Sequence, residues 1–336
     1  QSCTVSSNTR NAKPMMRNSL CKRCSALWCA LMLSLWCAAQ DILPHRLNAD
    51  GGAAVPQATD SCTELPPLRS LTFETASSMP SSFRNRKENV VANTAALRPA
   101  LDIVLRGERP LRVLHLGDSH VAGKAFPNAV EQTLRTAFRK AEVMPEDGSA
   151  GLAFTAIGSN GATSERFLSD SYRERIAATN ADLVIVSLGT NEAHGMGYLE
   201  SVHEQQLSAF LEMMRGVLPE ATFLFTTPPG DYLKQVYVNY RSTGRGGKRR
   251  RVVRSAFRPN PMNGRCAACI TAFARDHDLA SWDLYNICGG EAAVRNWIAA
   301  GLMRPDRVHY EPQGYAIQGK LLAEALLRCF ENAGTQ

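Results

Sequence analysis

Ser119, Asp306 and His309 are the residues whose types suit nucleophilic catalysis. A serine hydroxyl becomes a nucleophile when an imidazole accepts its proton and a carboxylate holds that imidazole in the correct tautomer. Asp306 precedes His309 by three residues, so its carboxylate can reach the imidazole if both lie on a turn. An isolated Asp-x-x-His pair is also typical of an exposed loop, and the surroundings of Ser119 must decide between the two interpretations.

Ser119 follows a predicted buried strand. Residues 111–116 (LRVLHL) are rich in Leu and Val, and the run ends at Gly117 before a helical pattern that begins near Lys124. At the carboxyl edge of a parallel sheet, such a turn lifts a hydroxyl out of the core and points helix N–H groups at a negative charge. The alternative is that Gly117 forms the turn and Ser119 only caps the helix.

Two further strand ends carry groups that can stabilise an oxyanion. The predicted strand at 151–157 runs into SNGA (159–162), and the apolar strand at 181–188 runs into GTNE (189–192). The side-chain amide of Asn191 and the backbone N–H of Gly161 are suitable donors. Each residue also has a structural interpretation, Asn191 as a helix cap and Gly161 as a turn with positive φ.

Predicted strands and helices alternate from residue 98 to residue 330. Additional strands are predicted at 221–226 and 279–284, with helices at 98–105, 125–141, 199–218, 263–276, 291–300 and 312–330. This alternation predicts one three-layer α/β/α domain around a central parallel sheet. The polar strand ends then converge at one edge of that sheet, where ligands bind in such folds.

In this order, the motifs GDSH (117–120), SNGA (159–162), GTNE (189–192) and DRVH (306–309) resemble the four blocks of the SGNH (GDSL-type) hydrolase family. The resemblance covers residues 112–330. It implies an SGNH-hydrolase fold of flavodoxin-like type.

The resemblance also implies a role for each matching residue. Ser119 is expected to be the nucleophile, His309 the base and Asp306 its orienting acid. The expected oxyanion hole comprises the backbone N–H groups of Ser119 and Gly161 and the side chain of Asn191. Neither a cofactor nor a metal is expected.

Two departures from the family pattern narrow the expected activity. His120 stands where the family name has Leu, and the third block has the form GTNE. With residues 282–285 and 289–290, they resemble the exported branch that includes peptidoglycan O-acetylesterases. The implied activity is removal of acetyl groups from an acylated carbohydrate polymer of the cell envelope. Acyl transfer to another sugar and envelope binding on a degenerate hydrolase fold are alternatives that remain open.

The N-terminal region is expected to direct export and then to lead into the domain. Residues 1–39 comprise upstream residues and a signal-like segment, in which basic residues precede the apolar run 25–39. This run is shorter than the roughly 20 residues of a membrane-spanning helix. Residues 40–95, rich in Ala, Pro, Ser and Thr, predict a flexible leader, and the hydrolase domain is expected at 96–332. We therefore expect a periplasmic or secreted protein.

Five cysteines follow the signal-like segment. Export favours one or two disulfides among them, with an odd thiol left over and the pairing open. Cys266 and Cys269 have the spacing of half a zinc site, but no second pair of ligands accompanies them. The five are Cys62, Cys266, Cys269, Cys288 and Cys329.

A basic insertion is expected at 232–260, which holds nine basic and no acidic side chains although the whole chain carries only +7. We expect a mobile hairpin or loop that binds an anionic glycan or contacts a membrane surface, and a solvated charge run is the alternative. Export and the lack of a recognisable motif argue against nucleic acid. The candidate substrate-binding residues are His194, Lys248, Arg249, Arg250 and Arg251.

Overall fold

The computed structural model describes residues 68–74, 79–242, 247 and 249–333. Residues 64–336 form one compact unit. The signal-like segment, Cys62 and Lys248 lie outside the described residues, as does the leader up to residue 67.

A six-stranded sheet forms the centre of this unit. Its spatial order is β1 (Val91–Ala92), β8 (Ala280–Trp282), β5 (Thr222–Thr226), β4 (Leu183–Ser187), β2 (Pro110–Gly117) and β3 (Gly151–Gly158). Neighbouring strands are parallel except for β1, which pairs antiparallel with β8 at one edge. The five parallel strands follow the flavodoxin-like order, in which the direction of winding reverses between β2 and β4. The expected α/β/α class is therefore confirmed, with one antiparallel edge strand added.

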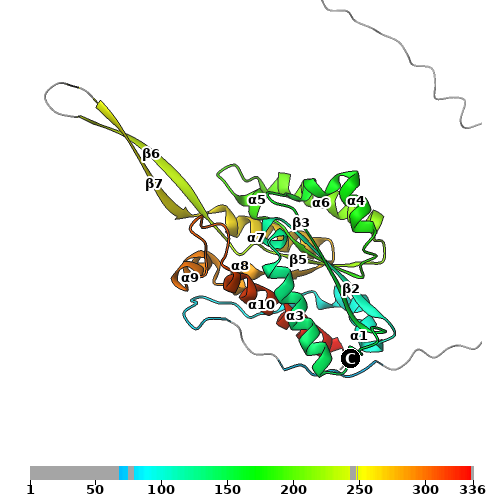
Figure 1. Cartoon of the computed structure of the whole chain (residues 1–336). Coiled ribbons are helices and arrows are strands. Elements are labelled where there is room, and N and C mark those ends of the chain that lie inside the picture. Colours follow the sequence, from blue (N-terminus) through cyan, green and yellow to red (C-terminus); the bar gives the residue numbers. More distant parts are fainter. Residues whose placement is uncertain (1–67, 75–78, 243–246, 248, 334–336) are drawn as a thin grey trace, which may run out of the picture. The chain divides into compact units, whose positions relative to one another are not determined.

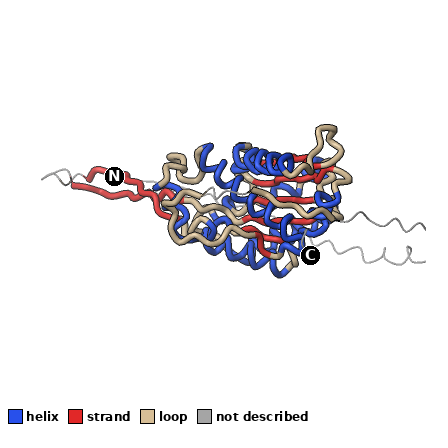
Figure 2. The backbone as a smooth tube through the Cα atoms, turned by 90° about the horizontal axis from the view of Figure 1, so that it is seen from below, coloured by secondary structure: helices blue, strands red, loops and turns tan. Residues whose placement is uncertain are grey.

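Helices cover both faces of the sheet, as Figures 1 and 2 show. Strand side chains alternate between the two faces, so Val113 and Ile185 join one buried cluster while Leu114 and Val184 join the other. The first cluster includes α1 (Arg98–Arg106), α3 (Ala125–Lys140), α9 (Ala293–Ala299) and α10 (Pro312–Ala333); the second includes α4 (Asp170–Ala177), α6 (Glu200–Val217) and α7 (Met262–Asp276). The short helices are α2 (Ser119–Ala122), α5 (Thr190–Ala193), α8 (Leu284–Ile287), η1 (Thr94–Leu97), η2 (Ser164–Leu168) and η3 (Gly290–Ala292).

Residues before 96, which the sequence assigns to the leader, already pack against the domain. The buried Phe73 ring lies 6.0 Å from the ring of Phe138 and 6.2 Å from that of Phe330. Phe83 makes an edge contact with Trp297 at 4.8 Å. The expectation of a flexible leader is therefore wrong for its described part, because its scattered apolar side chains are buried against helices of the domain.

The basic insertion is an antiparallel hairpin of its own. It consists of β6 (Tyr232–Ser242) and β7 (Arg249–Pro259), which pair from Tyr232 and Pro259 to Ser242 and Arg249. The two strands are labelled in Figure 1, where they run away from the sheet and its helices.

Cys266, Cys269, Cys288 and Cys329 are all free thiols. The expected disulfides therefore do not form among these four cysteines. Among the described residues, no three His, Cys, Asp or Glu side chains are grouped as metal ligands would be. No helix of the described part is long and apolar enough to cross a membrane.

Candidate active site

Two glycines allow α2 to pack directly on the ends of two strands. A Cβ atom at Gly117 would lie 2.4 Å from Cγ2 of Val121, and one at Gly158 would lie 2.1 Å from the backbone nitrogen of Ala122. Neither position has space for a side chain. The backbone of β2 consequently turns sharply into α2 and places Ser119 at the carboxyl edge of the sheet, beside the point where the winding reverses.

Ser119, His309 and Asp306 lie within hydrogen-bond reach of one another. Oγ of Ser119 is 2.9 Å from Nε2 of His309, across 190 residues of sequence. Nδ1 of the same ring is 2.9 Å from Oδ2 of Asp306. The structure therefore brings together the three residues that the motifs single out.

The backbone fixes the carboxylate of Asp306. Its Oδ1 accepts the N–H groups of His309 at 2.9 Å and Val308 at 3.0 Å. Partial burial opposes ionisation, but these two bonds and the His309 ring outweigh it and lower the pKa of Asp306. Because an ionised carboxylate only accepts hydrogen bonds, the hydrogen of the neutral ring lies on Nδ1, which leaves Nε2 free to accept from Ser119.

The amide of Asn191 connects three of the motifs. Its Nδ2 donates to the carbonyl of Ala162 at 2.9 Å and to Oδ2 of Asp118 at 3.3 Å. Gly161 has φ +68°, and a Cβ atom there would meet nothing within 4 Å. The space beside the Cα atom of Gly161 is therefore open, and the next residue, Ala162, accepts from the Asn191 amide.

Two buried carboxyl groups hold the strand ends in place. Oδ1 of Asp118 accepts the N–H of His120 at 2.9 Å, while Glu192 accepts the N–H groups of Ser164 and Gly189, both at 3.0 Å. Burial is the largest influence on both groups and raises the pKa of Asp118 and that of Glu192 to about 7, although these hydrogen bonds oppose it. Both side chains brace turns beneath the site.

His120 and Tyr315 form a contact that the sequence analysis missed. Nδ1 of His120 is 2.9 Å from the hydroxyl of Tyr315 on α10, and its ring centroid lies 5.5 Å from that of His309. Burial lowers the pKa of His120 to about 3, so the ring is neutral. The His120 ring, held by the Tyr315 hydroxyl, therefore packs beside the His309 ring.

His194 has an acidic partner that the sequence did not reveal. Nδ1 of His194 is hydrogen-bonded to Oδ2 of Asp231, which is buried and also accepts from Asn260 at 2.8 Å. Tyr310 directly follows His309 in the chain. Its hydroxyl donates a hydrogen bond of 2.7 Å to the carbonyl of Gly230, the residue before Asp231. The side chain of His194 is 43% exposed, and its contact with substrate stays a prediction.

The predicted substrate-binding arginines do not lie at this site. Arg250 pairs with Arg241, nine residues along β6 from the root of the hairpin at Tyr232. At roughly 3.4 Å per residue, this separation is about 30 Å. Residues 249–251 therefore lie far along a hairpin that extends away from the domain, and their binding of an anionic polymeric substrate stays a prediction.

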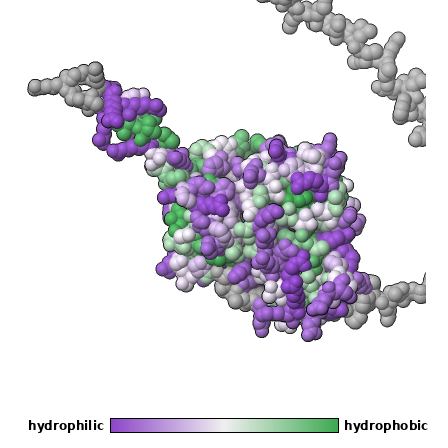
Figure 3. Space-filling view, viewed as in Figure 1, coloured by the Kyte–Doolittle hydropathy of each residue, from purple (hydrophilic) through white to green (hydrophobic). Residues whose placement is uncertain are grey.

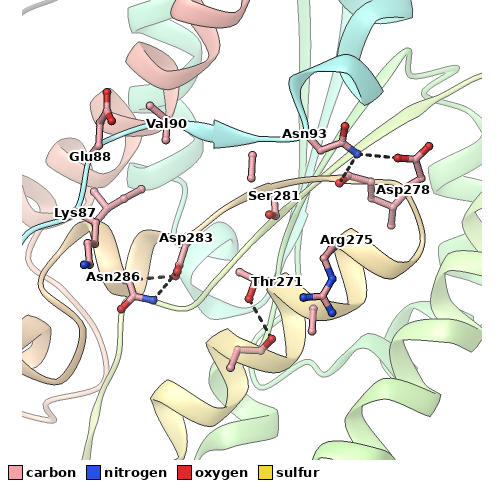
Figure 4. A pocket seen from close by; sticks show the side chains of 15 residues that line it. Lys87, Glu88, Val90, Asn93, Thr271, Arg275, Asp278, Ser281, Asp283 and Asn286 are labelled. Carbon is pink, nitrogen blue, oxygen red and sulfur yellow. Dashed lines mark hydrogen bonds between the residues drawn. The ribbon is translucent and has the colours of Figure 1, made fainter.

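A cavity of about 1050 Å³ lies elsewhere, between residues 87–93, α7 and α8 (Figure 4). Its polar lining is already paired in part. Asn286 donates to Oδ2 of Asp283 at 2.6 Å, and Asn93 donates to Oδ1 of Asp278 at 3.0 Å. The cavity lining includes none of the residues of the Ser119 site.

The sequence profile of the GDSL-like lipase/acylhydrolase family matches residues 115–317. The chain therefore belongs to this family of hydrolases. The match spans β2 to α10 and includes all four motifs.

Comparison with solved structures gives one match that supports the fold. The structure of a peptidoglycan O-acetylesterase is similar with a TM-score of 0.54 and 18% identity, over 71% of this chain and 96% of that one. A GDSL-like lipase from Bacteroides thetaiotaomicron gives a TM-score of 0.40 and 16% identity, over 70% and 95% of the two chains. The curated proteins gave no match to this sequence. The first likeness confirms the expected SGNH-hydrolase fold.

Proposed function

We propose that the protein is an exported serine esterase that removes acetyl groups from carbohydrate of the cell envelope, with peptidoglycan as the foremost candidate. One observation carries the proposal. Oγ of Ser119 lies 2.9 Å from Nε2 of His309, whose Nδ1 lies 2.9 Å from the Asp306 carboxylate. This is the arrangement in which an imidazole activates a hydroxyl for attack on an ester.

In the proposed reaction, Oγ of Ser119 attacks the acetyl carbonyl carbon while Nε2 of His309 takes its proton. Asp306 stabilises the resulting imidazolium. The tetrahedral intermediate collapses as His309 returns the proton to the departing sugar oxygen, which leaves an acetyl group on Ser119. A water molecule activated by His309 then releases acetate and restores the serine.

Three groups are proposed to stabilise the oxyanion. The N–H of Ser119 begins a helix and has no acceptor within that helix, and the space beside the Cα atom of Gly161 is open. The amide of Asn191 already has two acceptors. Its 3.3 Å bond to Asp118 is the longer of the two and is the bond that an oxyanion would displace.

The proposed substrate class and location have separate support. The motifs resemble the exported branch that includes peptidoglycan O-acetylesterases, and a solved enzyme of that name shares the fold over 71% of this chain. The basic residues before the apolar run 25–39 have the pattern of an export signal.

The test compares wild type, Ser119→Ala and a control, Ser171→Ala, which alters an exposed serine on α4. Each protein is incubated with p-nitrophenyl acetate, O-acetylated peptidoglycan and acetylated xylan, and released acetate is measured. We expect wild type and the control to release acetate from the small ester and from peptidoglycan, and Ser119→Ala to release none.

Each alternative gives a different result. No turnover by wild type on any substrate would favour a binding protein on a degenerate hydrolase fold. Release of acetate from acetylated xylan but not from peptidoglycan would identify xylan-type polysaccharide as the substrate class. Acetyl appearing on an added acceptor sugar, in place of free acetate, would identify an acyltransferase.

A further inference from the structure

The β6–β7 hairpin exposes large apolar side chains. Val236, Val238, Tyr240 and Val253 are exposed by 60%, 42%, 63% and 53%. None of them belongs to either hydrophobic cluster of the described residues. Exposure of neighbouring aliphatic groups is costly in water and often marks a binding surface.

The register places these four side chains on one face. Val238 is directly opposite Val253, and Val236 and Tyr240 precede and follow Val238 by two residues. Because successive side chains of a strand point to opposite faces, all four project to the same side, which we call the apolar face. Tyr237 lies on the other face, paired with Arg254.

Cations lie at the distal end of the apolar face and along the opposite face. Arg251 is directly opposite Tyr240, and Arg249 is opposite Ser242, so the distal end of the apolar face is basic. None of the described cations of the hairpin forms an ion pair with a described carboxylate. Figure 3 shows hydrophobic and strongly hydrophilic surface next to each other on these strands. The hairpin is thus amphipathic and carries uncompensated positive charge.

We propose that the hairpin docks on an anionic lipid bilayer, with its apolar face in the interfacial region and its arginines on lipid phosphates. Guanidinium groups bind phosphate oxygens in pairs, and basic amphipathic segments bind anionic bilayers through both contributions. A glycan fits less well. Sugar hydroxyls against the three valines would lose hydrogen bonds to water without gaining any.

The root of the hairpin connects this surface to the hydrolase site. The N–H of Tyr232 donates to the carbonyl of Arg307 at 2.9 Å. Arg307 lies between Asp306 and His309 in the chain. The guanidinium of Arg307 lies 4.6 Å from the centroid of the Phe257 ring. A bilayer-bound hairpin would therefore hold the Ser119 site at a defined distance from the membrane. The inference concerns location and does not depend on the proposed function.

The first experiment measures binding of the compact unit, residues 64–336, to vesicles by sedimentation in about 0.15 M salt. This unit lacks the apolar run 25–39, which would itself bind lipid. We expect binding to vesicles containing phosphatidylglycerol and none to pure phosphatidylcholine. The combined change of Arg249, Arg250 and Arg251 to Gln should weaken binding at least tenfold. The control changes Arg139, Arg173 and Arg295 to Gln, which removes equal charge outside the hairpin and should weaken binding no more than twofold.

The second experiment tests which face meets the lipid. Val252 and Val253 are neighbours on β7 that project to opposite faces. Val253→Thr should weaken binding several-fold, whereas Val252→Thr should leave it unchanged. Both substitutions keep a β-branched residue in the strand, so the hairpin is retained.

The third experiment locates the hairpin in the bilayer. Tyr240→Trp and Tyr237→Trp place an indole on the apolar and the opposite face, and the native Trp282 and Trp297 of the unit are buried. Lipids with a spin label near the headgroup should quench Tyr240→Trp at least twofold more than Tyr237→Trp.

Three results would overturn the proposal. The first is retention of the unit on purified peptidoglycan with no binding to anionic vesicles, which would assign the hairpin to a glycan. The second is equal vesicle binding by wild type and the triple arginine variant. The third is equal quenching of the two Trp variants, which would leave the apolar face outside the lipid. Thermal melts that match wild type will show that each variant is folded.

Discussion

The backbone N–H of Tyr232 lies 2.9 Å from the backbone carbonyl of Arg307. This bond attaches the first residue of β6 to the loop that carries Asp306 and His309. The guanidinium of Arg307 reinforces the attachment, because it lies over the rings of Tyr232 at 5.4 Å and Phe257 at 4.6 Å. The loop that orients the imidazole therefore packs against the hairpin root as well as against the domain.

Removing the guanidinium should loosen this loop. Arg307 and Phe257 are half-buried and Tyr232 is buried. Arg307→Ala deletes two cation–π contacts, each worth about 0.5–2 kcal/mol. We expect kcat/KM for p-nitrophenyl acetate to fall about two- to fivefold. Arg304→Ala is the control, because it shortens another arginine of the same loop that has no ring contact among the described residues. Equal kinetics for the two variants would argue against a positioning role for Arg307.

Loss of Ser119 or His309 should nearly abolish hydrolysis. Because a catalytic serine and its base act as one unit, Ser119→Ala and His309→Ala are each expected to lower kcat by at least about 10⁴-fold. For the same reason the double variant should be no slower than either single one. Single-turnover assays with p-nitrophenyl acetate will measure the three rates. A double variant with multiplied losses would show that the residues act independently.

Asp306→Asn tests the tautomer directly. The asparagine Oδ1 can still accept the backbone N–H groups of Val308 and His309, which preserves the turn. Its Nδ2 donates to Nδ1 of the ring, so the ring hydrogen moves to Nε2 and that nitrogen can no longer accept from Ser119. We expect kcat to fall about 10²- to 10⁴-fold while the melting temperature changes little. Unaltered kcat would exclude Asp306 as the orienting acid.

The parts of the site that the sequence predicted are those with a local signature. Gly117 and Ser119 follow a run rich in Leu and Val, and this pattern predicts both the strand and the turn after it. Asn191 follows a second run of the same kind. Since parallel strands end at a common edge, two local patterns were sufficient to bring these residues together.

The parts that the sequence did not predict depend on distant partners. His120 and Tyr315 are 195 residues apart, and the tyrosine lies in an ordinary amphipathic helix. In the sequence Asp231 has the pattern of an exposed loop residue, whereas in the structure it is buried beside His194. The direction of the hairpin also depends on contacts between distant residues at its root. The sequence therefore predicted the positive charge of this segment but not that it extends away from the domain.

Asn191→Ala separates oxyanion stabilisation from folding. Loss of one oxyanion donor lowers kcat by about 10²- to 10³-fold, with little change in KM. The variant also loses bonds to Ala162 and Asp118, which should cost about 1–3 kcal/mol of unfolding free energy. Kinetics and urea unfolding will measure the two effects separately. Wild-type kcat together with reduced stability would leave Asn191 a purely structural role.

A buried histidine makes stability depend on pH. His115 is buried in β2, where Nε2 is 2.8 Å from Oγ of Ser187 and the ring packs 4.9 Å from that of Phe126. Burial lowers the pKa of His115 to about 3, well below the usual value near 6.5 for an unfolded chain. Between these values the unfolded chain binds a proton that the folded protein does not. The stability contribution is therefore complete above the unfolded pKa and is lost as the pH falls.

Replacing the ring by one that cannot titrate should remove this dependence. Within the pH window from about 6.5 down to about 4, wild type is expected to lose about 1.4 kcal/mol per pH unit through this single group, and His115→Phe should lack that loss. Urea unfolding at several pH values gives the slope, which is informative even if the larger ring changes absolute stability. Phe126→Leu is the control, because it removes the same ring contact but no titrating group, so its slope should equal that of wild type. Parallel slopes for His115→Phe and wild type would mean that the pKa of His115 is the same in the folded protein as in the unfolded chain, since only a group whose pKa differs between the two states contributes to the slope.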